Sequence, residues 1–297
     1  MNSSDYRCGY SAIVGRPNVG KSTLLNYLLG QKIAITSRKP QTTRKILLGV
    51  DTQDKYQAIY IDTPGIHEFS GSEMNRYMVR SAVSVLYDVD AIIMIVDRGF
   101  WTKEDDLVLN HVRSFKGARF VAINKIDLLD KKNSLLPIMD RLDQVGCFDG
   151  IFPISALNAE GLAPLRQAVM STLPIQHHLF PPDHITDQPE RFLVSEIIRE
   201  KVVRNFGDEV PYKTGVVIEH YKSREGVLDI AADIIVERSG QKRILIGKGG
   251  EGLKRVGIEA RGDIERLTGT KVMLRLWVKV KRSWTNRTAA LRHMGYE

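Results

Sequence analysis

The chain has 297 residues, of which 43% are hydrophobic and 26% charged, a composition typical of a folded globular protein long enough for two domains. It has two cysteines, Cys8 and Cys147, which excludes a disulfide framework and a cysteine-based metal site and is typical of a reducing compartment. The first ten residues lack the apolar core of a signal peptide, and the longest apolar run, Ala91 to Val96, is too short to cross a bilayer. We therefore expect a cytoplasmic protein whose contact with any membrane is peripheral.

The net charge of +8 is unevenly distributed along the chain. Residues 1–179 carry 21 Lys and Arg against 18 Asp and Glu, residues 180–238 carry 8 against 12, and residues 239–297 carry 14 against 5. A basic C-terminal segment indicates a polyanionic partner, either nucleic acid or an anionic membrane surface. On charge alone, a solvated basic face explains the pattern equally well.

The first predicted strand and helix enclose a phosphate-binding motif. Ser11 to Val14 is a short apolar run, residues 22–29 have a helical pattern, and between them lies Gly15-Arg16-Pro17-Asn18-Val19-Gly20-Lys21-Ser22, followed by Thr23. This is the Walker A pattern G-x-x-x-x-G-K-S. Its glycines permit a tight turn whose N–H groups point at phosphate oxygens, beside the positive end of a helix. Lys21 is expected to contact the β- and γ-phosphates, and the Ser22 hydroxyl to contact a Mg²⁺ ion.

The polar loop that follows is predicted to supply a further metal ligand. Residues 32–45 are polar and basic and contain Thr42 and Thr43 ahead of a strand near residues 46–51. A threonine hydroxyl here can complete the Mg²⁺ shell when a γ-phosphate is present. We favour Thr43, although spacing alone does not choose between the two.

A carboxylate is expected at the end of the next strand. Residues 56–61 form an apolar run that leads into Asp62-Thr63-Pro64-Gly65. The C-terminal ends of strands in α/β sheets are where ligands bind. Asp62 is therefore predicted to hold Mg²⁺ through a water molecule, and the Gly65 N–H to contact the γ-phosphate.

Two later strands predict the part of the site that recognises the base. Residues 120–123 lead into Asn124-Lys125-Ile126-Asp127, an N-K-x-D pattern in which the Asp127 carboxylate accepts from both N1–H and the 2-amino group of guanine. Adenine lacks this donor pair and would leave the buried carboxylate unpaired. Residues 151–154 lead to Ser155-Ala156, whose backbone N–H is predicted to meet guanine O6, with Leu157 beside them. The signatures together predict a doubly wound α/β domain that binds guanine nucleotides.

A proline-rich stretch separates this domain from the basic segment. Residues 174–190 contain four prolines and cannot form one helix or strand. We therefore predict domains at residues 1–175 and 191–297, joined by a linker over residues 176–190.

The second domain is predicted to be smaller, of the α+β class. Its pattern is helix, strand, strand, helix, glycine loop, helix, strand, with the loop at Gly247-Lys248-Gly249-Gly250. The last strand, residues 271–281, has apolar residues on one face and basic residues with Trp277 on the other. This order is that of a type II KH domain, in which the glycines let the backbone approach sugar-phosphate and an adjacent apolar groove accepts about four unpaired bases.

The sequence resembles the translation-factor-related GTPases and, more closely, the bacterial Era family of ribosome-assembly GTPases. The residues that carry the resemblance are GRPNVGKS, ITSRKPQTTR, DTPGIH, NKID, PISAL, IGKGG and WVKVK, and it covers nearly the whole chain. It implies a P-loop GTPase domain followed by a type II KH domain. It also implies hydrolysis of GTP to GDP and phosphate, with Lys21, Thr43 and Gly65 in catalytic contact and Thr43 on Mg²⁺.

The resemblance further implies a ribosomal partner. It points to binding of single-stranded ribosomal RNA near the 3′ end of the small-subunit RNA, action on the 30S particle during its assembly, a monomeric state, and peripheral contact with the inner membrane. The RNA-binding residues expected from it are Ile246, Gly247, Lys248, Gly249, Gly250, Lys254, Arg255, Lys279 and Lys281.

Two positions depart from related patterns. Ile66 follows the D-T-P-G segment, where Ras-like enzymes place the glutamine that orients the attacking water, and an alkyl group cannot do this. Hydrolysis is therefore expected to be slow unless another group, a partner or a monovalent cation completes the site. Asn18 matches the asparagine of potassium-stimulated relatives, which makes K⁺ a hypothesis. Near the C-terminus, Ser283 and residues 285–287 differ from the more acidic tail of the family.

Two other functions fit part of the pattern. One is an RNA-binding scaffold whose nucleotide site is only structural, against which the intact Lys21, Ser22, Thr43 and Asp62 argue. The other is a GTPase whose basic domain docks on an anionic membrane. The His177-His178 pair lacks partners at ligand spacing, so a metal site there is not expected.

Overall fold

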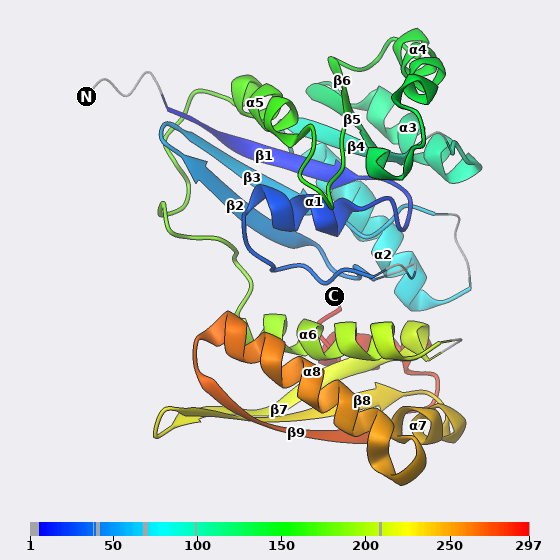
Figure 1. Ribbon diagram of the computed structural model, residues 1–297, viewed down its shortest axis with the longest axis vertical. Helices are drawn as coiled ribbons and strands as arrows, with labels where there is room; N and C mark the ends of the chain where they lie inside the picture. Colours follow the sequence, from blue (N-terminus) through cyan, green and yellow to red (C-terminus); the bar gives the residue numbers. More distant parts are fainter. Residues whose placement is uncertain are drawn as a thin grey trace. The chain divides into compact units, whose positions relative to one another are not determined.

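The computed structural model describes residues 6–37, 39, 42–67, 71–98, 100–207 and 210–296. The chain divides into two compact units, each with its own sheet (Figure 1). The first unit comprises residues 1–34, 43–70 and 78–187, and the second comprises residues 35–42, 71–77 and 188–297.

The first unit is built on a six-stranded sheet in the order β2-β3-β1-β4-β5-β6 (Figure 1). Its strands are β1 (Arg7–Val14), β2 (Leu47–Gln53), β3 (Tyr56–Asp62), β4 (Ala91–Asp97), β5 (Ala118–Asn124) and β6 (Gly150–Pro153). The edge strand β2 is antiparallel to β3, and all other neighbours are parallel. The continuous apolar run of β4 is buried throughout except at its last residue, as a central parallel strand requires.

Helices cover both faces of this sheet. They are α1 (Lys21–Leu28), α2 (Glu73–Ser84), α3 (Lys103–Ser114), α4 (Leu136–Gln144) and α5 (Leu162–Thr172). One core cluster joins the sheet to α3, α4 and the later part of α2, whereas α1 and α5 pack against β1 and β3. The doubly wound α/β prediction is confirmed.

The stretch predicted as a linker is hydrogen-bonded to the first unit up to Thr186. The buried Gln57 side chain on β3 accepts from the backbone N–H of Leu179 (2.8 Å) and Phe180 (3.0 Å) and donates to the Phe180 carbonyl (2.9 Å). Val50 N–H on β2 donates to the Ile185 carbonyl at 2.8 Å. As the prolines predict, residues 174–187 form neither a helix nor a strand. These bonds nevertheless attach the segment to the first unit, which extends to residue 187.

The second unit confirms the predicted order of elements. These are α6 (Glu190–Asn205), β7 (Gly215–Arg224), β8 (Val227–Val236), α7 (Ser239–Ile246), α8 (Glu251–Thr268) and β9 (Lys271–Val280). The sheet runs β7-β8-β9, with β8 antiparallel to β7 and parallel to β9. The helices pack on one face of the sheet around a shared apolar core (Figure 1).

The C-terminal residues belong to the core of the second unit. Trp284 is completely buried, and its indole N–H donates to the Lys213 carbonyl at 3.1 Å. Thr285 Oγ1 donates to the buried Glu237 carboxylate at 2.6 Å. A short helix, α9 (Thr288–His293), follows and was not predicted. The departure from an acidic tail therefore has a packing role.

Several single turns complete the chain. The 3₁₀ turns are η2 (Val85–Tyr87), η3 (Ile126–Leu128), η4 (Lys132–Leu135), η5 (Pro211–Lys213), η6 (Lys248–Gly250) and η7 (Trp284–Asn286). Within the described ranges, no helix combines the length and the apolar character that a bilayer span requires.

Candidate nucleotide site and nucleic-acid interface

The Walker loop (residues 15–22) joins β1 to α1 through a backbone that only glycine accepts. Gly20 caps α1 with φ of 107°, and a Cβ there would lie 2.2 Å from Asn124 Nδ2. The buried Lys21 ammonium donates to the carbonyl oxygens of Gly15 (3.1 Å) and Arg16 (3.0 Å). Burial lowers the pKa of Lys21 to about 8, although the charge of Asp62 opposes the shift. A phosphate beside this ammonium would favour its charged form. The predicted contact of Lys21 with the β- and γ-phosphates would therefore raise its pKa again.

The three predicted metal ligands lie together. Ser22 Oγ donates to Asp62 Oδ2 at 2.7 Å, and Thr43 Oγ1 lies 2.7 Å from Ser22 Oγ and 3.3 Å from Asp62 Oδ2. Burial raises the pKa of Asp62 to about 6, although the charge of Lys21 and the hydrogen bonds from Ser22 and Thr43 oppose the shift. Its other oxygen, Oδ1, is buried and has no hydrogen-bond partner in the described structure. A divalent cation would stabilise the charged form of Asp62 and would give its Oδ1 a partner, so this set of oxygens fits Mg²⁺.

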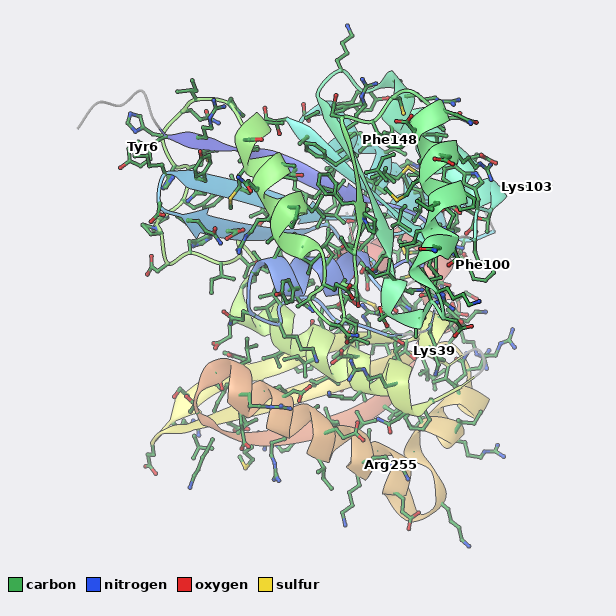
Figure 2. All side chains as sticks on the ribbon, turned by 45° about the horizontal axis from the view of Figure 1, so that its top comes forward. Tyr6, Lys39, Phe100, Lys103, Phe148 and Arg255 are labelled. Carbon is green, nitrogen blue, oxygen red and sulfur yellow. The ribbon has the colours of Figure 1, made fainter. Side chains whose placement is uncertain are left out.

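A second metal site is not indicated in the described part of the chain. Among the residues that the structure describes, no group of three or more His, Cys, Asp or Glu side chains could hold a metal ion. His177 and His178 instead contact the ring of Tyr6. Tyr6 directly precedes β1 (labelled in Figure 2).

The D-T-P-G segment lies directly on the Walker loop. Thr63 Oγ1 donates to the Ile13 carbonyl at 2.9 Å, and Ile66 N–H donates to the Gly15 carbonyl at 3.2 Å. At Gly65, a Cβ would lie 2.7 Å from the Pro17 nitrogen, so no larger residue fits without movement. The backbone expected at the γ-phosphate is therefore held against the phosphate loop.

Ile66 is a core residue. Its side chain is 2% exposed and packs in the cluster formed with α3 and α4. An apolar side chain that lies inside the core cannot hydrogen-bond an attacking water, which agrees with the interpretation of the sequence.

The base-recognition residues are brought together by hydrogen bonds. Asn124 Nδ2 donates to the Val19 carbonyl at 2.7 Å, and Asn124 Oδ1 accepts from Ala156 N–H at 2.9 Å. Ser155 Oγ donates to Asp127 Oδ1 at 2.5 Å, which holds the carboxylate in place. Since Ala156 N–H already has an acceptor, its predicted contact with guanine O6 would share or replace that bond. Leu157 is largely exposed.

Two acidic residues lie beside this site without having been predicted from the sequence. Asp105 is completely buried and accepts from Arg16 Nε at 3.0 Å and from Thr102 N–H at 2.9 Å, which fixes a side chain of the Walker loop. The signal for it was Thr-x-x-Asp, a capping pattern at the start of α3. Asp97, at the end of β4, accepts from Lys125 Nζ at 2.6 Å. Its position at a strand end was the available clue.

In the second unit, the glycine loop has the backbone that its sequence predicts. Gly247, Gly249 and Gly250 have φ of 73°, 61° and 82°, a region that side chains rarely adopt. Lys248 and Gly249 are exposed between α7 and α8. A Cβ added at Gly249 or Gly250 would meet no neighbouring atom within 4 Å, so the backbone of the loop can be approached closely by a ligand.

The remaining predicted RNA contacts differ in character. Lys254 and Arg255 are exposed on α8, and Lys281 is exposed after β9 (Figure 2 labels Arg255). Lys279 instead pairs with the nearly buried Asp233, and this hydrogen bond raises the pKa of Lys279. Its charge is therefore already compensated within the sheet.

Exposed apolar side chains near the glycine loop were missed in the sequence. Ile244 on α7 and Ile258 on α8 are each 55% exposed, and Ile246 is half-buried beside the loop. Exposed isoleucines on the two helices that flank a glycine loop are the kind of apolar surface on which unpaired bases would pack. The sequence after the glycine loop predicts two helical stretches separated near Gly257, which is wrong, because α8 continues through Gly257 without a break. The periodicity also does not show that Ile258 falls outside the buried stripe of this helix.

Comparison with known proteins agrees with this arrangement. The family model described as 50S ribosome-binding GTPase matches residues 10–125, and the model described as KH domain matches residues 209–285. GTPase Era of Marinobacter nauticus is 51% identical, with 97% of this chain and 95% of that protein covered. GTPase Era of Ectopseudomonas mendocina is 52% identical, with 98% and 97% covered. The chain belongs to the Era family of GTPases.

Solved structures of Era share the fold over nearly the whole length. A single-residue variant of Aquifex aeolicus Era bound to GDP·AlF4⁻ is 40% identical, covers 98% of this chain and 99% of that one, and has a TM-score of 0.94. Era in complex with MgGDPNP and nucleotides 1506–1542 of 16S ribosomal RNA is 39% identical with the same coverage and TM-score. The predicted fold class and the GTPase and KH assignments are confirmed, and the chain is an enzyme that hydrolyses GTP.

Proposed function

We propose that this Era-family GTPase binds the 3′ end of small-subunit ribosomal RNA and acts in assembly of the 30S particle. The first unit would bind and hydrolyse GTP, and the second would hold unpaired RNA at the glycine loop. The observation that carries the proposal is the coexistence of an intact phosphate and metal site with an open glycine loop, each in its own unit.

In the nucleotide site, each residue would have a stated role. The backbone of residues 15–23 would surround the phosphates, and Lys21 would neutralise their charge. Ser22 and Thr43 would ligate Mg²⁺ directly and Asp62 through a water, since Oδ1 is the oxygen left unpartnered. Mg²⁺ would draw charge from the β- and γ-phosphates.

The RNA assignment is supported by relatives and by the loop. Era has been solved with nucleotides 1506–1542 of 16S ribosomal RNA. In this chain, Lys248 would neutralise a backbone phosphate, and the isoleucines of α7 and α8 would pack against bases. We also propose a cytoplasmic monomer. The monomeric state is supported by β8, whose large apolar side chains after Val227 are buried within the unit itself.

A direct test compares binding to single-stranded RNA, duplex RNA and anionic liposomes, and measures GTP hydrolysis. We expect single-stranded RNA with the sequence of the small-subunit 3′ end to bind more tightly than duplex RNA of equal length, and the protein to hydrolyse GTP with and without it. Binding to anionic liposomes in preference to that RNA would favour the membrane-docking alternative. Nucleotide binding without any hydrolysis would favour the scaffold.

K⁺ stimulation is a separate proposal that depends on Asn18. Asn18 lies in the Walker loop with φ of 65°, a conformation that asparagine tolerates better than most residues. We expect faster hydrolysis in K⁺ than in Na⁺ buffer of equal ionic strength, and loss of that difference in Asn18→Ala. Equal rates for the parent protein in the two buffers would remove K⁺ from the site.

A further inference from the structure

The attacking water has no positioning group in the residues considered so far. Ras-like enzymes orient this water with a glutamine directly after the D-T-P-G segment. Here that position is Ile66, whose side chain lies in the apolar core. A neighbouring residue of the segment that lies on the Walker loop is one candidate for the group that orients the water.

The next residue, His67, is attached to the backbone that lies on the Walker loop. His67 Nδ1 lies 2.8 Å from the Gly65 carbonyl oxygen. Gly65 in turn lies against Pro17, and Ile66 N–H is bonded to the Gly15 carbonyl. The imidazole is thus held two residues from the N–H expected to contact the γ-phosphate.

This hydrogen bond fixes the tautomer of the ring. A carbonyl oxygen can only accept, so Nδ1 carries the proton and donates it to Gly65. In the neutral imidazole, Nε2 then has a free lone pair and is an acceptor. His67 Nε2 is buried and has no hydrogen-bond partner in the described part of the chain. A buried acceptor without a partner is costly and calls for an explanation, such as a catalytic role or a bound water.

We propose that His67 is a catalytic residue whose Nε2 accepts a hydrogen bond from the attacking water. The water oxygen forms the bond to the γ-phosphorus, and the bond to the β–γ bridging oxygen breaks with its electron pair remaining on GDP. One water proton passes to Nε2 and from there to the released phosphate, so the imidazole is neutral again at the end. The proposal rests on the placement of the γ-phosphate beside Gly65 that is proposed above.

The test separates hydrolysis from nucleotide binding. Three variants of the full-length protein are compared with the parent: His67→Ala, His67→Gln, and His178→Ala as the control. His178 also has a buried Nε2 without a partner in the described residues, but it packs on Tyr6 in the segment that follows α5. The measurements are the single-turnover rate at saturating GTP and the affinities for GDP and for GDP·AlF4⁻.

In His67→Ala, the rate should fall by roughly 10- to 100-fold, because an acid–base group in the transition state is lost. Affinity for GDP·AlF4⁻ should fall with it, whereas affinity for GDP should stay within about threefold because the ground-state contacts remain. His67→Gln should recover part of the rate, since its amide oxygen can accept from water. His178→Ala should behave as the parent.

Three results would overturn the inference. They are a parent-like rate in His67→Ala, a fall in GDP affinity as large as the fall in rate, and a His67→Gln variant no faster than His67→Ala. Failure of the proposed function looks different, because the parent protein itself would then not hydrolyse GTP.

Discussion

The recognition of the base that we propose depends on one carboxylate and the hydroxyl that holds it. Asp127 Oδ1 accepts from Ser155 Oγ at 2.5 Å, and Ser155 is completely buried. The carboxylate therefore has a fixed orientation before any nucleotide binds, which reduces the entropy lost on binding. At the scale of single residues, we therefore expect this pair to decide whether the site prefers guanine over adenine.

In Asp127→Asn, we expect preference for GTP to be replaced by preference for xanthosine triphosphate. The amide places a donor toward the donors of guanine, and loss of the charge-assisted pair should cost on the order of 3 kcal/mol. The C2 carbonyl of xanthine accepts the new donor. Equilibrium binding of both nucleotides measures the exchange, with Ser155→Ala as a control that weakens binding but keeps the preference for guanine. Native GTP affinity in Asp127→Asn would contradict the assignment.

Ile66 affects stability more than chemistry. Its side chain is 2% exposed in the core, so Ile66→Ala should lower the free energy of unfolding by about 2–4 kcal/mol. Turnover per folded molecule should change only modestly, because the alkyl group does not contact water. Urea unfolding and single-turnover hydrolysis below the unfolding transition measure the two effects. A collapse of the rate in the folded variant would show that this side chain shapes the water site.

At the scale of elements, the C-terminal tail is attached to the second sheet through one buried acid. Glu237, directly after β8, accepts from Thr285 and forms an ion pair with Lys213 Nζ at 3.2 Å. Burial raises the pKa of Glu237, but the hydrogen bonds from Thr285 and Lys213 outweigh it, and the net effect is a lowered pKa. The charged form is therefore stabilised in the folded state.

Glu237→Gln should lower the free energy of unfolding by about 1–3 kcal/mol at pH 7. Because the folded-state pKa is lowered, the contribution of Glu237 is complete above the unfolded-state pKa, which is about 4.3. It is lost as the pH falls through the folded-state pKa. The difference between parent and variant should therefore shrink as urea unfolding is repeated from pH 7 toward acid.

The control for that experiment is Glu225→Gln, at an exposed position in the turn between β7 and β8. It should leave stability within about 0.5 kcal/mol of the parent at each pH. A difference for Glu237→Gln that stays constant down to acid unfolding would show that the charge of Glu237 does not hold the tail.

At the scale of the whole molecule, the two activities are carried by units with separate cores. The residues of the phosphate and metal site belong to the first unit, and the glycine loop belongs to the second. Each unit has its own sheet and its own buried cluster. Changes at an exposed loop of one unit should therefore leave ligand affinity in the other intact.

Replacing both Lys248 and Gly249 by Asp should abolish RNA binding without loss of GTP binding. Two negative charges where a phosphate is expected should reduce affinity for single-stranded RNA by about 2 kcal/mol or more, with a shallower salt dependence. Because Gly249 has φ of 61°, the backbone change should also cost about 1 kcal/mol of stability. Fluorescence binding of RNA and of GTP at two salt concentrations measures both outcomes.

The matched control replaces the same two residues by Asn, which imposes the same backbone cost without the charge. It should retain more RNA affinity than the Asp pair. Lys279→Ala should weaken binding less than either, because Asp233 already compensates that lysine. A folded double-Asp protein that binds RNA as tightly as the parent would show that the basic segment contacts another partner.

Much of this site could be predicted because its residues follow strands. Asp62, Asn124 and Ser155 each come directly after an apolar run, and parallel strands bring their C-terminal ends to one edge of a sheet. Asp105 and His67 were not predicted to take part. Asp105 approaches Arg16 from a distant helix, and the role of His67 depends on a hydrogen bond that spacing does not reveal.

The sequence by itself predicted a doubly wound GTPase domain followed by a KH domain and the chain order of the elements in the second unit, and it proposed the phosphate, metal and base residues. Local spacing suffices for these because glycine turns and strand ends fix where side chains emerge. Only the tertiary structure decided which polar groups are paired. It showed that residues 176–187 hydrogen-bond along the first sheet, that Trp284 fills the second core, and that Lys279 is neutralised by Asp233. Burial and pairing depend on residues far apart in the chain, and no local pattern specifies them.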